Sequence, residues 1–186
     1  MKFHALGAGV VAMLLVTQAQ AQTWPAKPVR LVIPFAVGGG ADILGRLFAQ
    51  KLYQQTGQTV IADTRAGAGG NLGAELTAKA PADGYTVLFT TNSLAVNVSL
   101  YPKLNYSALT DLTPVALVAA VPLILVVHPS VPVRTVKELI ALAKKRPNGL
   151  NFGSNGSGTT SHLSGVLLGD LAKISITHIP YKGAGA

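Results

Sequence analysis

Two glycine-rich stretches in this sequence have the residue types and spacing that suit anion binding. The first glycine turn is residues 35–42 (FAVGGGAD) and follows an apolar run; the second glycine turn is residues 151–162 (NFGSNGSGTTSH). Glycine lets the backbone turn sharply with its N–H groups accessible, and a helix starting there adds unpaired amides and the positive end of its dipole. Such a turn can hold an anion. We expect the two turns to face one small acidic ligand.

Each turn also has a simpler interpretation. The first could be only a tight turn; it is not a dinucleotide-binding fingerprint, because Ile43 stands where the last glycine is needed, nor a P-loop, because no G-K-[ST] follows. The second could be a polar loop in which Ser or Thr caps a helix. It contains no Lys, Arg, Asp or Glu, which suits a carboxylate bound by neutral donors. We expect Asp42 to orient the first turn or to meet a ligand ammonium, because its carboxylate would oppose an anion.

Catalysis and metal binding have weaker support. His162 could act as a general base, but the sequence has no G-x-S-x-G motif and no readable Ser–His–acid set, so we expect a structural hydrogen-bonding role. His128 and His178 lack metal-ligand spacing, and no metal site is expected. The chain has no cysteine, which excludes disulfides and thiolate chemistry.

The elements that would position the first turn alternate between strand and helix. Such a series predicts an open α/β sheet whose ligands lie beyond the carboxyl ends of the strands, so that Phe35, Thr91 and Asn92 share a rim. The glycine-rich segment 65–73 links the second predicted strand to a short helix. Apolar runs and helical spacing predict strands over 29–35, 59–63 and 85–91, and helices over 41–55 and up to 79.

A second series follows a predicted domain crossing. Residues 92–114 are expected to be loop, and the apolar runs 115–121 and 123–128 to be two strands separated by Pro122, which forces a bend or an edge position. The crossing is placed near Val121 and Pro122. The later elements are a helix that opens with the capping box Thr135 to Glu138 and runs to 145, a strand over 150–153, a helix after the second glycine turn, and a strand over 174–181.

The N-terminus indicates export. Residues 1–21 combine a basic start, an apolar run and a small-x-small ending, which predicts a signal peptide cleaved near Ala21. A membrane anchor is disfavoured because the run is shorter than the roughly 20 residues that a span needs. The formal net charge is +8, from 15 Lys and Arg against 7 Asp and Glu, but the basic residues are scattered with few aromatics among them, and nucleic-acid binding is unsupported.

The ordered motifs resemble the Bug receptors, the periplasmic solute-binding proteins of tripartite tricarboxylate transporters. The resemblance implies a periplasmic binding protein type II-like fold, with two open α/β domains and a hinge. It also implies a monomer that binds a small carboxylate, whether a di- or tricarboxylate, an acidic amino acid or an aromatic acid, and delivers it to membrane transporter subunits. No catalysis, cofactor or stable membrane insertion is implied. The motifs are residues 27–35, 38–42, 67–73, 82–85, 153–158 with His162 and Leu163, and 180–183.

In that family the two glycine turns hold the ligand carboxylate, largely through backbone groups and ordered water. We transfer this role to the matching positions of the present sequence and add Thr91 and Asn92, at the end of the third predicted strand. Together these residues are the predicted ligand-binding site. They are Phe35, Ala36, Gly38, Gly39, Asp42, Thr91, Asn92, Gly153, Ser154, Asn155, Gly156, Thr159 and His162.

Family members are about twice as long, a size that fits two full domains. We therefore expect a C-terminally truncated arrangement, with domain 1 over 22–121 lacking a returning segment and an incomplete domain 2 over 122–186. The family's usual proline after the Arg of the third loop is Ala66 here, which should loosen that turn. The alternatives to a carboxylate receptor are an exported α/β hydrolase that uses the second glycine turn, or a fragment without function.

Overall fold

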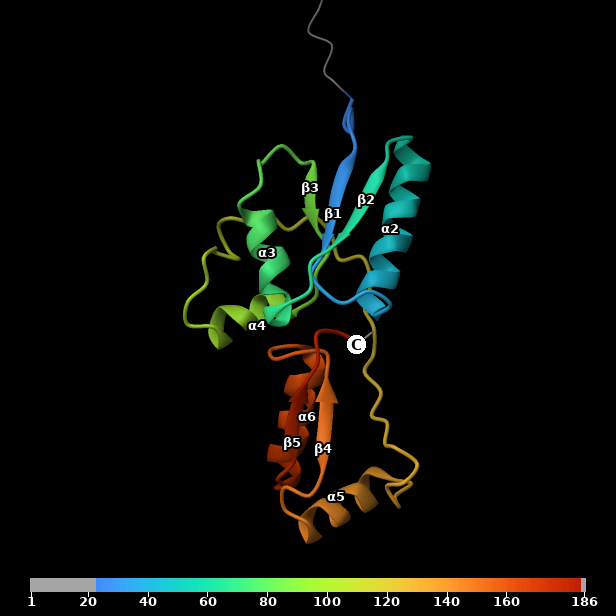
Figure 1. The fold of residues 1–186 in the computed structure, drawn as a ribbon, viewed down its shortest axis with the longest axis vertical. Coiled ribbons are helices and arrows are strands. Elements are labelled where there is room, and N and C mark those ends of the chain that lie inside the picture. The colour runs from blue at the N-terminus through green and yellow to red at the C-terminus, as the bar shows by residue number, and fades with distance from the viewer. Residues whose placement is uncertain (1–22, 185–186) are drawn as a thin grey trace, which may run out of the picture.

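The computed structural model describes residues 23–184 and shows two α/β units placed end to end (Figure 1). The predicted signal peptide lies outside the described residues. The first unit holds a sheet of order β2-β1-β3 and the second a sheet of order β4-β5. The elements are β1 (Val29–Ile33), α2 (Gly40–Thr56), β2 (Val60–Thr64), η2 (Ala68–Gly70), α3 (Asn71–Ala78), β3 (Thr86–Leu88), α4 (Ser93–Leu100), α5 (Val136–Lys145), β4 (Asn151–Ser154), α6 (Thr160–Ala172) and β5 (Thr177–Pro180).

Strand β1 is the centre of the first unit. It pairs in parallel with β2 on one side and β3 on the other, as the alternation of strands and helices predicted. Ile33 packs against α2 and Val32 against α3, so one helix covers each face of the sheet (Figure 1). A strand covered on both faces is expected to be largely apolar, and β1 is apolar at every position except Arg30. The apolar core gathers around Leu31, Ile33 and Ala49.

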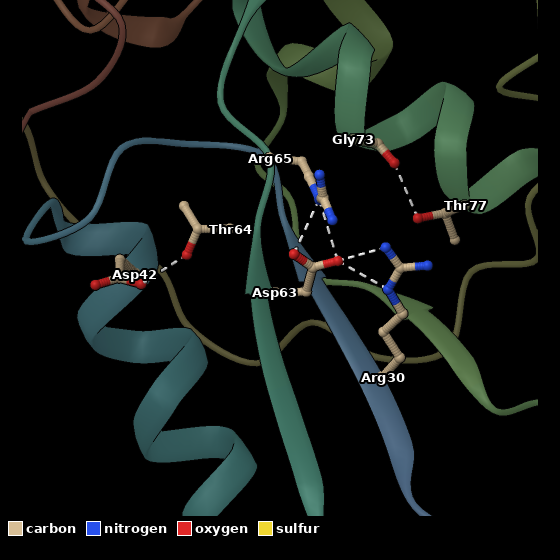
Figure 2. Close-up of polar contacts among 7 residues, drawn as sticks. All are labelled: Arg30, Asp42, Asp63, Thr64, Arg65, Gly73 and Thr77. Carbon is tan, nitrogen blue, oxygen red and sulfur yellow. Dashed lines mark hydrogen bonds and ion pairs between the residues drawn. The ribbon is translucent and has the colours of Figure 1, made fainter.

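An ion-pair cluster links β1 to β2 (Figure 2). The Asp63 carboxylate accepts hydrogen bonds from Arg30 Nε at 2.8 Å and from Arg65 Nε at 2.9 Å. Burial raises the pKa of Asp63, but the hydrogen bonds from the two guanidinium groups outweigh it and keep this pKa below its ordinary value. The cluster therefore holds the end of β2 where the segment of residues 65–73 begins.

The second unit is smaller and more open. Strands β4 and β5 pair in parallel, and Gly165 of α6 lies directly against the Phe152 ring. Helix α5 begins as the capping box predicted: Thr135 Oγ1 accepts from the Glu138 backbone N–H at 3.2 Å. It lies at the end of this unit farthest from the first unit (Figure 1).

Two predictions for the segment between the units were wrong. The runs 115–121 and 123–128 form no strand; both are extended and exposed, with Leu117 90% and Ile124 81% exposed. A strand needs a neighbour for its backbone groups, and none of the five described strands pairs with these runs. Residues 92–114 are not all loop either, because helix α4 occupies the start of this range. Residues 101–135, called the linker below, contain no helix or strand.

Within residues 23–184, no helix has both the length and the apolar character required to cross a membrane.

Candidate functional site

The carboxyl ends of the strands in both units point toward the same gap (Figure 1). A cavity of about 210 Å³ lies there, with walls from both units. An open α/β sheet is expected to bind its ligand at this end of its strands. The cavity is lined by Pro34, Phe35, Gly67, Ala68, Gly69 and Gly70 of the first unit, by Tyr101 at the start of the linker, and by Asn155, Gly156, Ser157, Pro180, Tyr181 and Lys182 of the second unit.

Asp42 organises the first glycine turn. Its side chain is only 4% exposed; Oδ2 accepts from the Gly38 N–H at 3.0 Å, and Oδ1 accepts from Arg46 Nε at 2.9 Å. The hydrogen bond from Arg46 lowers the pKa of Asp42 below its ordinary value, against the opposing effect of burial. Asp42 therefore points back into its own loop, which is the first of the two roles expected for it.

Ser154 organises the second glycine turn from its buried position at the end of β4. Its Oγ accepts from the Gly156 N–H and lies within hydrogen-bonding distance of the Gly156 carbonyl, both at 3.2 Å. Thr159 Oγ1 donates to the same carbonyl at 2.6 Å. The remaining contact of the Ser154 hydroxyl is His178 Nε2, 2.6 Å away. These contacts fix the backbone that forms one wall of the cavity.

Two histidines lie beneath this turn. The rings of His162 and His178 stack with centroids 3.9 Å apart and an interplanar angle of 20°. His162 Nδ1 accepts from the Gly158 N–H at 3.2 Å, so His162 has the structural hydrogen-bonding role expected for it. Burial, followed by the charge of His162, lowers the pKa of His178 below its ordinary value.

Among residues 23–184, the two units touch at glycines and through one direct hydrogen bond between side chains. Thr160 Oγ1 at the start of α6 donates to Asn92 Oδ1 at 2.6 Å. A Cβ added at Gly69 would lie 2.4 Å from the Ser157 carbonyl oxygen, and one added at Gly158 would lie 2.5 Å from Asn97 Oδ1. At Gly69 the backbones of the two units approach more closely than a larger residue would allow, and at Gly158 the backbone approaches side chains of α4 equally closely.

Asn97 of α4 ties this contact to the first unit. Its Nδ2 donates to the Gly69 carbonyl at 3.1 Å and to Asn71 Oδ1 at 3.0 Å, and Tyr106 OH donates to Asn71 Oδ1 at 2.8 Å. Asn97 Oδ1 and Asn71 Nδ2 are buried without a hydrogen-bond partner in the described residues. The region behind Gly69 therefore holds one acceptor and one donor that no described residue uses. Leaving a buried polar atom unpaired is costly.

The structure brings only some of the predicted binding residues to the cavity wall. Phe35, Asn155 and Gly156 line it. Ser154, Thr159 and His162 lie behind the second turn and hold its shape, as Asp42 does for Gly38 in the first turn. Asn92 contacts the other unit, and the Thr91 hydroxyl contacts Ser93. Ala36, Gly39 and Gly153 do not line the cavity.

Sequence reasoning missed a third contributor, residues 67–70, and the pair Tyr181 and Lys182. The signal for residues 67–70 was present, because this glycine-rich segment also follows the carboxyl end of a strand in the same sheet. Nothing in the local sequence places Tyr181 opposite that segment. Among residues 23–184 no group of His, Cys, Asp or Glu could hold a metal ion.

Comparison with known proteins gives a consistent result. The sequence profile described as "Tripartite tricarboxylate transporter family receptor" matches residues 44–186. The protein BugT of Bordetella pertussis is 40% identical over 182 residues, which are 97% of this chain and 56% of BugT. The chain spans about half the length of the curated relatives it matches.

Solved structures give the same match. The R. palustris protein Rpa4515, solved with adipate, superposes with a TM-score of 0.84 and 42% identity, over 87% of this chain and 55% of that one. MatC of Rhodopseudomonas palustris, solved with bound malate, superposes with a TM-score of 0.78 and 34% identity over the same shares. The paired α/β units are thus the architecture of periplasmic solute-binding proteins.

Proposed function

Because this chain belongs to the tripartite tricarboxylate transporter receptor family, the Bug receptors, we propose that it is a periplasmic receptor that captures a small carboxylate between its two units. The ligand class is drawn from relatives, since Rpa4515 was solved with adipate and MatC with malate. The receptor would pass its ligand to the membrane subunits of a transporter. It would act as a monomer, without chemical conversion of the ligand.

The observation that carries the proposal is the cavity between the units. Its walls are formed largely by glycine-rich turns that follow parallel strands, and Gly70 of this wall is the N-cap residue of helix α3. Backbone N–H groups and helix N-termini suit a carboxylate. Lys182 is the charged residue of the wall and would attract an anion, while Phe35 and Tyr181 offer apolar surface to a carbon chain.

The alternative of an exported hydrolase draws on one contact, the 2.6 Å distance between Ser154 Oγ and His178 Nε2. A nucleophilic serine must be accessible and needs a base that a third group orients. Ser154 is only 5% exposed and its hydroxyl contacts both backbone atoms of Gly156. No carboxylate bonds His178 among the described residues. The geometry favours a serine that shapes the turn.

Calorimetric titration tests the proposal. The purified protein is titrated with malate, with adipate and with the uncharged diamide of adipate. We expect saturable binding of at least one of the two acids, no binding of the diamide, and about tenfold weaker binding in Ser154→Ala, because loss of one hydrogen bond costs about 1 kcal/mol or more.

Ser130→Ala is the matched control for this titration. The Ser130 hydroxyl also contacts a histidine nitrogen, His128 Nδ1 at 2.8 Å, but it lies in the linker. Its affinity should equal that of the wild type. Equal affinities in all three proteins would refute the role of the second turn. Ester hydrolysis that disappears in Ser154→Ala would favour the hydrolase.

A further inference from the structure

We propose that His162 and His178 form a proton-sensitive support beneath the second glycine turn, so that mild acid loosens the turn and weakens carboxylate binding. The effect on binding rests on the receptor function proposed above. The support itself rests on the contacts of the two rings. Both residues act through the turn and are therefore positioning residues.

The first step of the argument is the stack of aromatic rings. His178 of β5 stacks on His162 of α6 at 3.9 Å and on Phe152 of β4 at 4.9 Å. This stack joins three elements of the second unit, β4, α6 and β5, directly under the turn. Two imidazolium rings at this separation would repel each other, so the pair is compact only while at least one ring is neutral.

The second step is the direction of the hydrogen bonds. The Gly158 N–H donates to His162 Nδ1, so this nitrogen must keep its lone pair. If His162 Nδ1 carries a proton, its N–H faces the Gly158 N–H, and the hydrogen bond between the two residues is lost. His178 Nε2 differs, because it can either accept from Ser154 Oγ or donate to it. A proton on His162 Nδ1 is therefore incompatible with its hydrogen bond from Gly158, whereas a proton on His178 Nε2 is compatible with its contact to Ser154.

The third step is what Gly158 touches. It is buried against Asn97 and Leu100 of the first unit, where an added Cβ would clash with both side chains. A shift of its backbone moves Ser157, its neighbour in the chain, which lines the cavity and lies against Gly69. Loss of one hydrogen bond at His162 is thus transmitted to the wall that would hold the ligand and to the contact between the units.

The other charged groups near the pair do not provide this switch. Asp170 of α6 and Lys173, which follows that helix, line a cavity together with His178, but they form an ion pair with each other at 3.0 Å. Lys182, just after β5, is one of the residues that line the ligand cavity. Lysine remains charged across mildly acidic pH and carboxylates are ionised there, whereas histidine titrates in this range.

Nuclear magnetic resonance of the ligand-free protein tests the support without any ligand. The Gly158 amide signal is followed from about pH 8 to about pH 5.5, across the titration of histidine. It should shift in the wild type and stay constant in His162→Asn, whose side-chain oxygen can accept the same hydrogen bond without titrating. The Ser130 amide, which donates to His128 Nδ1 at 3.2 Å, reports an exposed pair of the same kind in both proteins.

Titration with malate and adipate over the same pH range tests the effect on binding. Wild-type affinity should fall several-fold on acidification, whereas that of His162→Asn should change by no more than the ligand's own ionisation requires.

The outcomes separate the two proposals. A constant wild-type Gly158 signal, or equal pH profiles for the wild type and His162→Asn, overturns the proton-sensitive support. A Gly158 signal that titrates while no acid binds at about pH 8 upholds the support and refutes the receptor function.

Discussion

Replacement of Gly69 by alanine should oppose the contact between the two units. The Gly69 φ angle is +63°, and an added Cβ would lie 2.4 Å from the Ser157 carbonyl oxygen of the other unit. A carbon and a carbonyl oxygen normally stay about 3.3 Å or more apart, so the backbones must separate by nearly 1 Å. Backbone cannot rotate away as the end of a flexible side chain can. The contact between the two units at Gly69 and Ser157 must therefore open.

The expected effect has two parts. Alanine in the left-handed conformation costs about 1–2 kcal/mol, whether the units are in contact or apart. Overpacking adds about 1–3 kcal/mol, and this part falls on the closed contact alone. A ligand held between the units should therefore bind about 5–150 times more weakly.

Gly57→Ala is the matched control. Gly57 ends α2 with φ +72°, and nothing lies within 4 Å of an added Cβ. This variant carries the backbone cost without the clash. It should lose stability in urea unfolding but keep the wild-type affinity for malate or adipate.

Small-angle X-ray scattering supplies a readout that needs no ligand. Gly69→Ala should have a larger radius of gyration than Gly57→Ala, because its units separate. Identical radii together with identical affinities in the two variants would refute the reasoning about closure.

Two further predictions concern the ends of helices. Asp42→Asn should lower the free energy of unfolding by about 2 kcal/mol at neutral pH, because it removes the charge that holds Arg46 and Gly38. The Asp42 pKa is lowered in the folded state, so its contribution is present above about pH 4 and is lost as the pH falls toward the folded-state value; the variant and wild type should therefore converge in acid urea unfolding. Thr135→Ala should destabilise α5 by about 1 kcal/mol, measured as faster amide exchange in that helix and no change at α2, and unchanged exchange in α5 would contradict the capping role.

The parts of the fold that sequence could predict are those set by neighbouring residues. The capping box at Thr135, the end of α2 at Gly57 and the bond from Gly38 to Asp42 all form within a few residues of chain. The sequence of β1 was equally informative, because a strand between two helices is expected to be largely apolar, and only Arg30 departs from this in β1.

The parts that could not be predicted depend on distant partners. Helix α4 (SLAVNVSL) has larger apolar residues at alternate positions, a pattern without helical spacing, and its anchor is Asn97 bonded to Gly69 and Asn71. The apolar runs 115–121 and 123–128 have strand sequences but no strand beside them. The Tyr181 and Lys182 wall faces residues 67–70 across the gap between the units, which no local pattern reveals.

The linker also determines how the two units find each other. It is the covalent connection between α4 and α5, so each unit is held near the other at an effective concentration on the order of millimolar. Closure is therefore an intramolecular equilibrium that dilution does not change. Exposed backbone without helix or strand is accessible to proteases. A single cut in the linker would turn closure into a bimolecular association, and the same surfaces would then meet only as fast as the concentration of the two pieces allows.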